Sequence, residues 1–266
     1  MTYANILFTE IDGVATLTLN RPAALNALTT EMIAEMIDAV DRVRDEGSAR
    51  VLLMTGAGRA FCSGADLVTG GATGERQRSG PVDTGHRLET HFNPLLERLF
   101  ALPVPFVTAV NGAAAGAGCS FALAGDIVVA ADSAYFLQAF VNIGLVPDVG
   151  ATWLLPRLAG KARAQGMMML GERVPAATAL DWGMIWQVAP DAELMATATA
   201  LAQRLAAGPT RAYGLIRQGI RDSLDTSLTG ALAIERRNQR SAGRSPDFAE
   251  GVAAFLSKRK AVFTGG

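Results

Sequence analysis

One acid stands out among the residues whose types and spacing could do chemistry. Asp148 is the only carboxylate between residues 134 and 152, and it lies in the segment Gly144-Leu-Val-Pro-Asp-Val-Gly150. A carboxylate in so apolar a segment should have a raised pKa, because desolvation disfavours its charged form. Such a group can take up and return a proton near neutral pH. The alternative is a turn residue, since Pro-Asp-x-Gly is a typical turn sequence.

A run of small residues precedes this acid. Residues 112–118 contain nothing larger than alanine, so a ligand carbonyl could approach the backbone and accept hydrogen bonds from its N–H groups. The segment 60–67 likewise presents small residues after an apolar run. Donors of this kind would stabilise an enolate, such as that of an acyl thioester, without supplying a proton. The alternative is that these glycines only permit tight packing of strand against helix.

Hydrophobic patterning predicts the elements that position these segments. Residues 14–19 alternate as in a half-buried strand, whereas 50–55, 106–110 and 126–130 are nearly continuous apolar runs typical of strands buried on both faces. Residues 69–85 are rich in Gly, Ser and charge without periodicity, which predicts a mobile surface loop over a binding cleft.

Amphipathic patterns predict the helices. Thr29 or Thr30 could cap the first of them, and another should open near Ala117. Apart from the helix near Ala117, the predicted helices cover residues 30–45, 85–101, 194–207, 210–224, 227–242 and 247–257. The order of elements predicts an α/β fold of repeated strand, strand and helix units over residues 1–195, followed by a helical C-terminal region over residues 196–266.

The composition is that of a globular protein. Of 266 residues, 50% are hydrophobic and 18% are charged, the net charge is −1, and no apolar run approaches the ~20 residues that span a bilayer. Scattered Lys and Arg give no support for nucleic-acid binding, and we expect a cytoplasmic protein without membrane association. Cys62 and Cys119 lack the spacing of zinc ligands, so we expect reduced core thiols and no metal site.

The two small-residue segments, taken with Asp148, resemble the enoyl-CoA hydratase/isomerase superfamily, also called the crotonase family. The resemblance extends from residues 19–22 to residues 255–260. It implies a ββα spiral core, a C-terminal helical region for trimerisation, and a homotrimer or a dimer of trimers. It also implies an oxyanion hole of two backbone N–H groups at Ser63 and Ala117, each contributing roughly 3 kcal/mol to transition-state stabilisation.

The resemblance further implies acyl-CoA as the substrate, with no separate cofactor, because coenzyme A is part of the substrate. The adenine should lie near residues 60–67, where Asp66 could form part of its wall or, as we prefer, an N-cap of the following turn. Arg21 and Lys258 match positions that approach the phosphates, Lys258 from this or a neighbouring subunit. The alternative for both is solvated surface charge. The residues expected to bind CoA or the acyl group are Arg21, Ala60, Cys62, Ala65, Asp66, Leu67, Gly116, Phe140 and Lys258.

The sequence departs from the family at two positions. Its hydratases carry two glutamates where this chain has Ser120 and Phe140. Hydration suits two carboxylates, and Phe140 should keep that corner dry, so the departures favour an isomerase. In that mechanism Asp148 would remove the proton alpha to the thioester and return it further along the conjugated system. Residues 152–160 and 181–188 resemble the branch of the family that converts ring 1,2-epoxyphenylacetyl-CoA to oxepin-CoA, and the same machinery should shift 3-enoyl-CoA to 2-enoyl-CoA.

Other interpretations remain open at this stage. An enoyl-CoA hydratase is the main alternative. A thioester hydrolase could use Cys119, Ser120 or Ser63 with His86 or His91, although neither serine lies in Gly-x-Ser-x-Gly. The segment 56–61 fits two thirds of a dinucleotide fingerprint, but Phe61 stands where Gly or Ala is needed. A non-catalytic scaffold is the last alternative.

Overall fold

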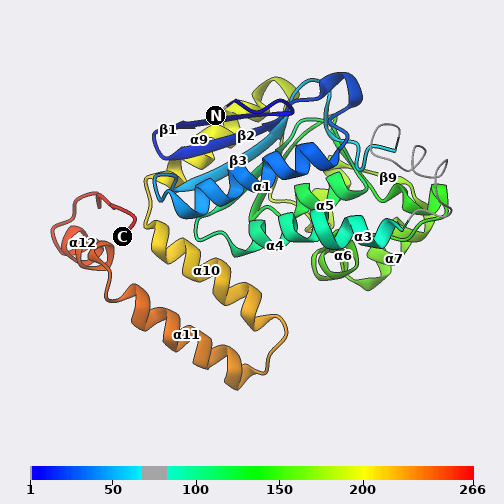
Figure 1. The fold of residues 1–266 in the computed structure, drawn as a ribbon. Helices are drawn as coiled ribbons and strands as arrows, with labels where there is room; N and C mark the ends of the chain where they lie inside the picture. Colours follow the sequence, from blue (N-terminus) through cyan, green and yellow to red (C-terminus); the bar gives the residue numbers. More distant parts are fainter. Residues whose placement is uncertain (1, 68–82) are drawn as a thin grey trace.

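The computed structural model describes residues 2–67 and 83–266. Its larger sheet has six strands in the order β1-β2-β3-β5-β7-β10 (Figure 1). Neighbouring strands are parallel except for the antiparallel pair of β1 and β2. These strands are β1 (Ile6–Ile11), β2 (Val14–Leu19), β3 (Val51–Gly56), β5 (Phe106–Val110), β7 (Ile127–Ala131) and β10 (Gln187–Ala189). All residues of β3 and β5 are buried, as their continuous apolar runs predict for central strands.

A smaller sheet has four strands of three residues each in the order β4-β6-β8-β9. They are β4 (Ala60–Cys62), β6 (Ala113–Ala115), β8 (Tyr135–Leu137) and β9 (Arg173–Pro175). The chain passes repeatedly from the larger sheet to the smaller one, from β3 to β4, from β5 to β6 and from β7 to β8. Together with the helix α5 (Ala117–Leu123) after β6, this confirms the predicted ββα units.

Helices surround the two sheets. The first, α1 (Thr30–Asp45), buries one apolar face, and its N-cap Thr29 accepts a hydrogen bond from the Met32 N–H at 3.2 Å. A continuous helical segment consists of α3 (Thr84–Arg87), the π-helical turn η2 (Leu88–Phe92) and α4 (Asn93–Ala101). The other helices before residue 194 are α6 (Ala151–Ala159), α7 (Lys161–Leu170) and α8 (Ala176–Asp181), with the 3-10 turns η1 (Pro22–Ala24), η3 (Ala139–Ile143) and η4 (Asp191–Glu193).

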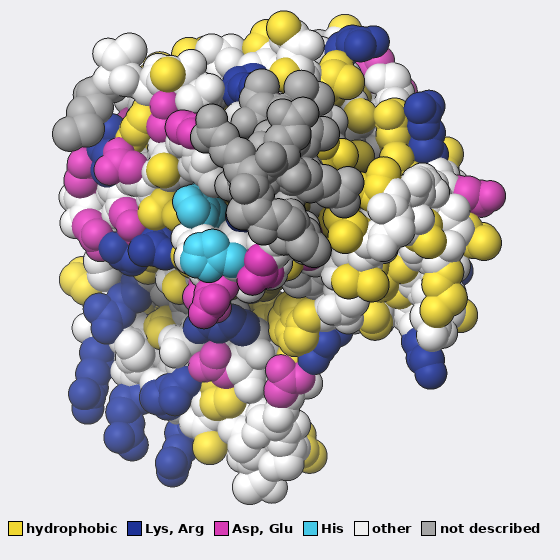
Figure 2. Space-filling model, turned by 45° about the vertical axis from the view of Figure 1, so that its right-hand side comes forward, with side chains coloured by type: hydrophobic (Ala, Val, Ile, Leu, Met, Phe, Trp, Pro, Cys, Tyr) yellow, Lys and Arg dark blue, Asp and Glu magenta, His cyan; other side chains and the backbone are white. Residues whose placement is uncertain are grey.

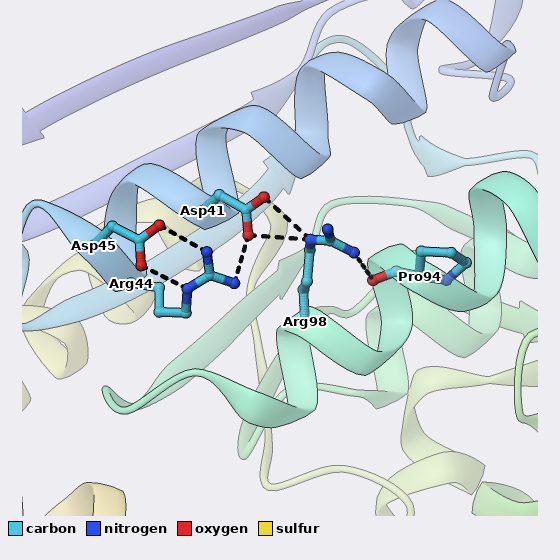
Figure 3. Close-up of polar contacts among 5 residues, drawn as sticks. All are labelled: Asp41, Arg44, Asp45, Pro94 and Arg98. Carbon is cyan, nitrogen blue, oxygen red and sulfur yellow. Dashed lines mark hydrogen bonds and ion pairs between the residues drawn. The ribbon is translucent and has the colours of Figure 1, made fainter.

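An ion-pair cluster joins α1 to α4 (Figure 3). Arg98 donates from Nε to both carboxylate oxygens of Asp41, at 3.0 and 3.1 Å, and from Nη1 to the Pro94 carbonyl at 3.0 Å. Arg44 pairs with Asp41 at 2.8 Å and with Asp45 at 2.7 Å. Because these groups are partly exposed, each pair contributes modestly to stability, and their main effect is to fix the start of α4 against α1.

The C-terminal helices divide into one that packs on the core and three that extend from it. Helix α9 (Leu194–Ala206) lies against β3, β5 and β7 through a face of buried Leu194 and small alanines. The other three, α10 (Thr210–Ser223), α11 (Leu228–Ala242) and α12 (Pro246–Leu256), project away from the sheets (Figure 1). The division after residue 195 stays a prediction.

Buried polar contacts hold the end of the chain in place. Arg50 donates to Thr210 Oγ1 at 3.0 Å, to the Gly208 carbonyl at 2.6 Å and to the Phe263 carbonyl at 3.2 Å. The buried Asp247 accepts hydrogen bonds from the N–H groups of Thr264 and Gly265. The tail is thereby tied both to β3 and to α12.

The structure adds elements that sequence patterning missed. Strand β1 and the three-residue strands of the smaller sheet are too short or too irregular to give a clear period. The predicted loop at 69–85 falls largely outside the described residues, apart from its last three, where α3 begins. No helix in the described parts of the chain is long and apolar enough to cross a membrane.

Candidate functional site

Asp148 lies in the turn between η3 and α6. Its side-chain Oδ1 is buried without a hydrogen-bond partner among the described residues, whereas its backbone carbonyl accepts from the Ala151 N–H at 3.0 Å. The next residue, Val149, is buried with φ of 48°, in a region that β-branched residues rarely adopt. Such a conformation costs on the order of 1–3 kcal/mol and is found mainly where a site requires it. Asp148 is therefore a turn residue, but one held in a strained turn that keeps its carboxylate unpaired.

Burial raises the pKa of Asp148 from 3.8 to about 6. Desolvation is the cause, because burial disfavours the charged form and Oδ1 has no hydrogen-bond donor among the described residues. The raised pKa that the sequence predicted is thus present in the structure. A carboxylate titrating near neutral pH can act as a base in one step and as an acid in the next.

Asp148 lines a cavity of about 300 Å³ beside the α3–α4 segment. Among the described residues that line the cavity, Asp148 is the only ionisable one. The lining residues are Thr84, Leu88, Asn93, Leu145, Val146, Pro147, Asp148, Val149 and Gly150. A ligand there would meet mainly apolar side chains and one carboxylate.

The two small-residue loops meet at their glycines. A Cβ atom on Gly64 would lie 2.9 Å from the Ala115 carbonyl oxygen and 3.7 Å from the Ala117 nitrogen. A Cβ atom on Gly118 would lie 2.5 Å from the Cys62 carbonyl oxygen. Gly64 and Gly116 also have positive φ values of 97° and 53°, which favour glycine. The glycines therefore permit tight packing of the two loops, and they also leave the backbone there uncovered by side chains.

The predicted oxyanion donors need a correction at Ser63. Its backbone N–H donates to the Leu25 carbonyl at 3.0 Å, so it is not free to bind a ligand oxygen. Ala65, two residues later, forms a parallel β-bridge with Leu28. The two hydrogen bonds of this bridge come from the residues on either side of Ala65, because the Leu28 N–H donates to the Gly64 carbonyl and the Asp66 N–H donates to the Leu28 carbonyl. In such a parallel bridge the N–H of Ala65 itself points away from Leu28.

The N–H of Ala65 has no hydrogen-bond acceptor within the described parts of the chain, and neither has the N–H of Ala117, the first residue of α5. Gly64 joins these two positions, because it precedes Ala65 and packs against Ala117. The pair of unengaged donors is therefore Ala65 with Ala117, rather than Ser63 with Ala117. Residue types alone could not distinguish Ser63 from Ala65.

The two positions at which the resemblance places glutamates lie next to the predicted site. Ser120 is buried in α5, and its Oγ donates to the Asp148 carbonyl at 3.4 Å. Phe140 is also buried, and its ring lies 3.5 Å from where a Cβ atom on Gly116 would stand. The corner beside the glycine loop is thus filled by an aromatic ring, as the sequence predicted.

Two predicted CoA-binding residues do not present their side chains to a ligand. Ala60 and Cys62 are both 1% exposed. The Cys62 thiol donates to the Asn26 carbonyl at 3.2 Å, and the Ala60 carbonyl accepts from Asn26 Nδ2 at 2.8 Å. The buried residue Asn26 thus holds the start of the loop by hydrogen bonds. Ala60 and Cys62 therefore support the backbone of this loop.

The charged residue of this loop, Asp66, is paired with Arg21. Arg21 forms a salt bridge to the buried Asp66 at 3.0 Å and also donates to the Ala27 carbonyl. The turn that Asp66 was predicted to cap begins outside the described residues. Leu67 and Lys258 are exposed. Lys258 follows α12, and that helix lies at the opposite end of the molecule from α3 and α6 (Figure 1).

The two cysteines are poor candidates for the nucleophile of a hydrolase in this structure. Cys62 and Cys119 are free and buried, and burial raises the pKa of each thiol to about 12, so neither is a ready nucleophile. The two histidines of the chain lie side by side at the surface (Figure 2). His91 Nδ1 lies within hydrogen-bond distance of the Thr90 hydroxyl, at 2.7 Å. Within the described residues no group of three or more His, Cys, Asp or Glu side chains could hold a metal ion.

Comparison with known proteins agrees with the fold. The family model described as enoyl-CoA hydratase/isomerase matches residues 9–266. The 1,2-epoxyphenylacetyl-CoA isomerase of Escherichia coli K12 is 50% identical over 254 residues, which are 95% of each chain. A protein of Rhodobacter capsulatus named as a probable enoyl-CoA hydratase is 44% identical over the full length of both chains.

Solved structures give the same result. An enoyl-CoA hydratase from Polaromonas sp. JS666 superposes with a TM-score of 0.90 at 33% identity, covering 97% of this chain and 99% of that one. The similarity therefore includes the C-terminal helices as well as the two sheets.

The raised pKa of Asp148 predicts a pH-dependent effect of the Asp148→Asn substitution on stability. Between the unfolded pKa of 3.8 and the folded pKa of about 6, the folded protein holds the proton more tightly, so ionisation lowers the native protein's stability as pH rises. Asparagine removes this penalty. We expect the variant to be more stable by on the order of 2 kcal/mol at about pH 7.5 and equal at about pH 3.5.

Urea unfolding of both proteins at the two pH values measures this difference. Asp191→Asn, at an exposed acid whose pKa is lowered, is the matched control and should not gain stability at the higher pH. A variant less stable than the native protein at about pH 7.5 would show that Asp148 is stabilised by a partner.

Proposed function

We propose that this chain, which belongs to the enoyl-CoA hydratase/isomerase family, is an acyl-CoA isomerase that moves a proton by means of a single acid. The observation that carries the proposal is that Asp148 is the one ionisable group among the described residues lining the cavity, and that it is desolvated and unpaired. A proton that leaves the substrate there has one group to go to, and the same group must return it.

The proposed reaction has two half-steps. In the first, the Asp148 carboxylate takes the proton from the carbon alpha to the thioester, and the electron pair of that C–H bond moves toward the thioester oxygen. The N–H groups of Ala65 and Ala117 would hold the resulting enolate oxygen. In the second, the protonated Asp148 returns the proton to the gamma carbon, so that the double bond moves from position 3 to position 2. Atoms and charge balance without water, and coenzyme A enters only as part of the substrate.

Several observations support isomerisation over hydration. Hydration requires a bound water together with groups that take and give protons, and in this family that work falls to two glutamates. Here Ser120 and Phe140 occupy those positions, Phe140 fills the corner beside Gly116, and the Ser120 hydroxyl is directed to the Asp148 carbonyl. The name of the Rhodobacter relative keeps enoyl-CoA hydration as the second candidate.

The proposed specific substrate is ring 1,2-epoxyphenylacetyl-CoA, converted to oxepin-CoA, with 3-enoyl-CoA as a further substrate. The 50% identity to the Escherichia coli isomerase supports this choice. The apolar walls of the cavity, formed by Leu88, Leu145 and Val146, would suit a ring better than a charged or extended polar group.

We also propose that the chain assembles as a homotrimer or a dimer of trimers through α10–α12. Ile216, Ile220 and Leu224 are 56%, 61% and 49% exposed and recur every four residues, which places them in one stripe along α10 and its C-terminal end. The stripe borders an apolar cavity of about 480 Å³. An exposed apolar surface of this kind is typical of a protein interface. Lys258 would then reach CoA phosphates from a neighbouring subunit.

The catalytic role of Asp148 predicts loss of isomerisation in Asp148→Asn. We expect kcat/KM for a 3-enoyl-CoA to fall about 10²- to 10⁴-fold, because the amide cannot take up a proton. In the native protein, kcat/KM should rise with pH through about 6 as Asp148 ionises, and then reach a plateau. The absorbance of the conjugated 2-enoyl thioester follows both experiments.

Hydration of a 2-enoyl-CoA, measured in the same preparations, is the control reaction and should be negligible. Strong hydration, or a variant that isomerises like the native protein, would contradict the single-acid mechanism and favour the hydratase.

The proposed interface predicts that Ile220→Glu lowers the molar mass in solution. A charge placed in a buried apolar interface is costly, so we expect the oligomer to dissociate toward monomer at micromolar concentration. Size-exclusion chromatography with light scattering measures the mass. Ile11→Glu, at an equally exposed isoleucine of β1, should leave it unchanged. A native monomer, or an unchanged mass in Ile220→Glu, would contradict this assembly.

A further inference from the structure

Three residues of the α3–α4 segment line the cavity at a spacing that an uninterrupted α-helix does not give. They are Thr84, Leu88 and Asn93, with steps of four and then five residues. The step of five is one π-helical turn, in which the Asn93 N–H donates to the Leu88 carbonyl. Phe92, which an α-helix would place on the cavity side, is instead buried in the core at 3% exposed. Because of the π-turn, the cavity wall carries the amide of Asn93 and not the aromatic ring of Phe92.

Pro94 provides a local cause for the π-turn. Proline has no N–H to donate to the carbonyl four residues earlier, and in an α-helix its ring would collide with that carbonyl, which belongs to Thr90. A wider turn relieves the collision. The Pro94 carbonyl is held by Arg98, which is itself paired with Asp41 on α1 (Figure 3). The position of Asn93 is therefore fixed by contacts on the side of the helix away from the cavity.

The cavity receives the part of a substrate that lies beyond Asp148. The loops that carry the Ala65 and Ala117 donors contribute no residue to its described lining. A thioester oxygen bound at those loops, with its alpha carbon at Asp148, therefore leaves the rest of the acyl group for the wall formed by Thr84, Leu88 and Asn93. This step depends on the proposed function.

Asn93 is the one amide on that wall. It is exposed, and its side chain makes no hydrogen bond within the described parts of the chain. The apolar neighbours Leu88, Leu145 and Val146 cannot recognise a polar atom, whereas an amide N–H can donate to an oxygen. A hydrocarbon acyl group would leave this amide unused.

We propose that Asn93 is a specificity-determining residue, which donates a hydrogen bond to an oxygen carried by the acyl group distal to the thioester, such as an epoxide or oxepin oxygen. The enzyme would then distinguish oxygen-bearing ring acyl groups from linear hydrocarbon ones at this position.

The test compares two substrates in the native protein and in Asn93→Leu, which keeps the size of the side chain but cannot donate. The substrates are ring 1,2-epoxyphenylacetyl-CoA and a linear 3-enoyl-CoA without acyl oxygen. We expect kcat/KM for the epoxide to fall about 10- to 100-fold and that for the 3-enoyl-CoA to change less than about threefold. The ratio of the two is the readout, because a general loss of structure would lower both.

Two control variants accompany the test. Leu88→Ala alters the shape of the same wall without changing hydrogen bonding, so it should affect both substrates. Asn142→Leu removes an exposed asparagine of η3 that bonds to the Gly171 carbonyl, away from the described lining, and should leave the ratio unchanged.

Equal losses on both substrates in Asn93→Leu, or no loss on either, would overturn the proposal. So would a native protein that isomerises the 3-enoyl-CoA but does not accept the epoxide. Failure of the proposed function is seen separately, as full isomerase activity in Asp148→Asn.

Discussion

The desolvation of the Asp148 carboxylate is the constraint on which the rest of the site depends. An acid in water would be ionised throughout the neutral range, whereas burial brings the pKa of Asp148 to about 6. The fold maintains this unfavourable environment through the left-handed conformation of Val149, whose side chain is buried in the core. The strain and the lost hydration are offset by packing elsewhere, which is the usual balance at a functional site.

The second requirement is that two loops come together without side chains between them. The transfer of the chain from the larger sheet to the smaller one places β4 beside β6, so that the loops after these strands become neighbours. Gly64 and Gly118 permit a close approach of the two loops that a Cβ atom at either position would prevent. The side-chain amide of Asn26 donates hydrogen bonds to the backbone carbonyl groups before and at the start of the first loop. Within the described residues, the N–H groups of Ala65 and Ala117 then have no acceptor. In the proposed reaction, negative charge would develop on the substrate between these donors and Asp148, so the chemistry would depend on the geometry of both loops.

The sequence predicted those features that depend on residue type. It did not predict those that depend on the direction of backbone N–H groups. The raised pKa of Asp148, the aromatic ring of Phe140 beside Gly116 and the ββα organisation agree with what residue types, apolar runs and the family resemblance predicted. The donor predicted at Ser63 was wrong, because its N–H donates to the carbonyl of Leu25, a residue distant in the sequence, whereas the N–H of Ala65 has no acceptor among the described residues. The burial of Ala60 and Cys62 depends on partners that are distant in sequence. The π-turn before Pro94 was also missed, although a proline inside a predicted helix is a signal that could have indicated it.

The measurement that tests the single-acid mechanism most directly is isotope transfer within one turnover. A 3-enoyl-CoA deuterated at the alpha carbon is isomerised in ordinary water, and mass spectrometry locates the label in the 2-enoyl product. A single buried acid should deliver part of the deuterium to the gamma carbon, because the proton it removes is the one it returns. Complete loss of the label from the gamma position in the earliest product, across the pH range of activity, would contradict the return of the same proton by one shielded acid.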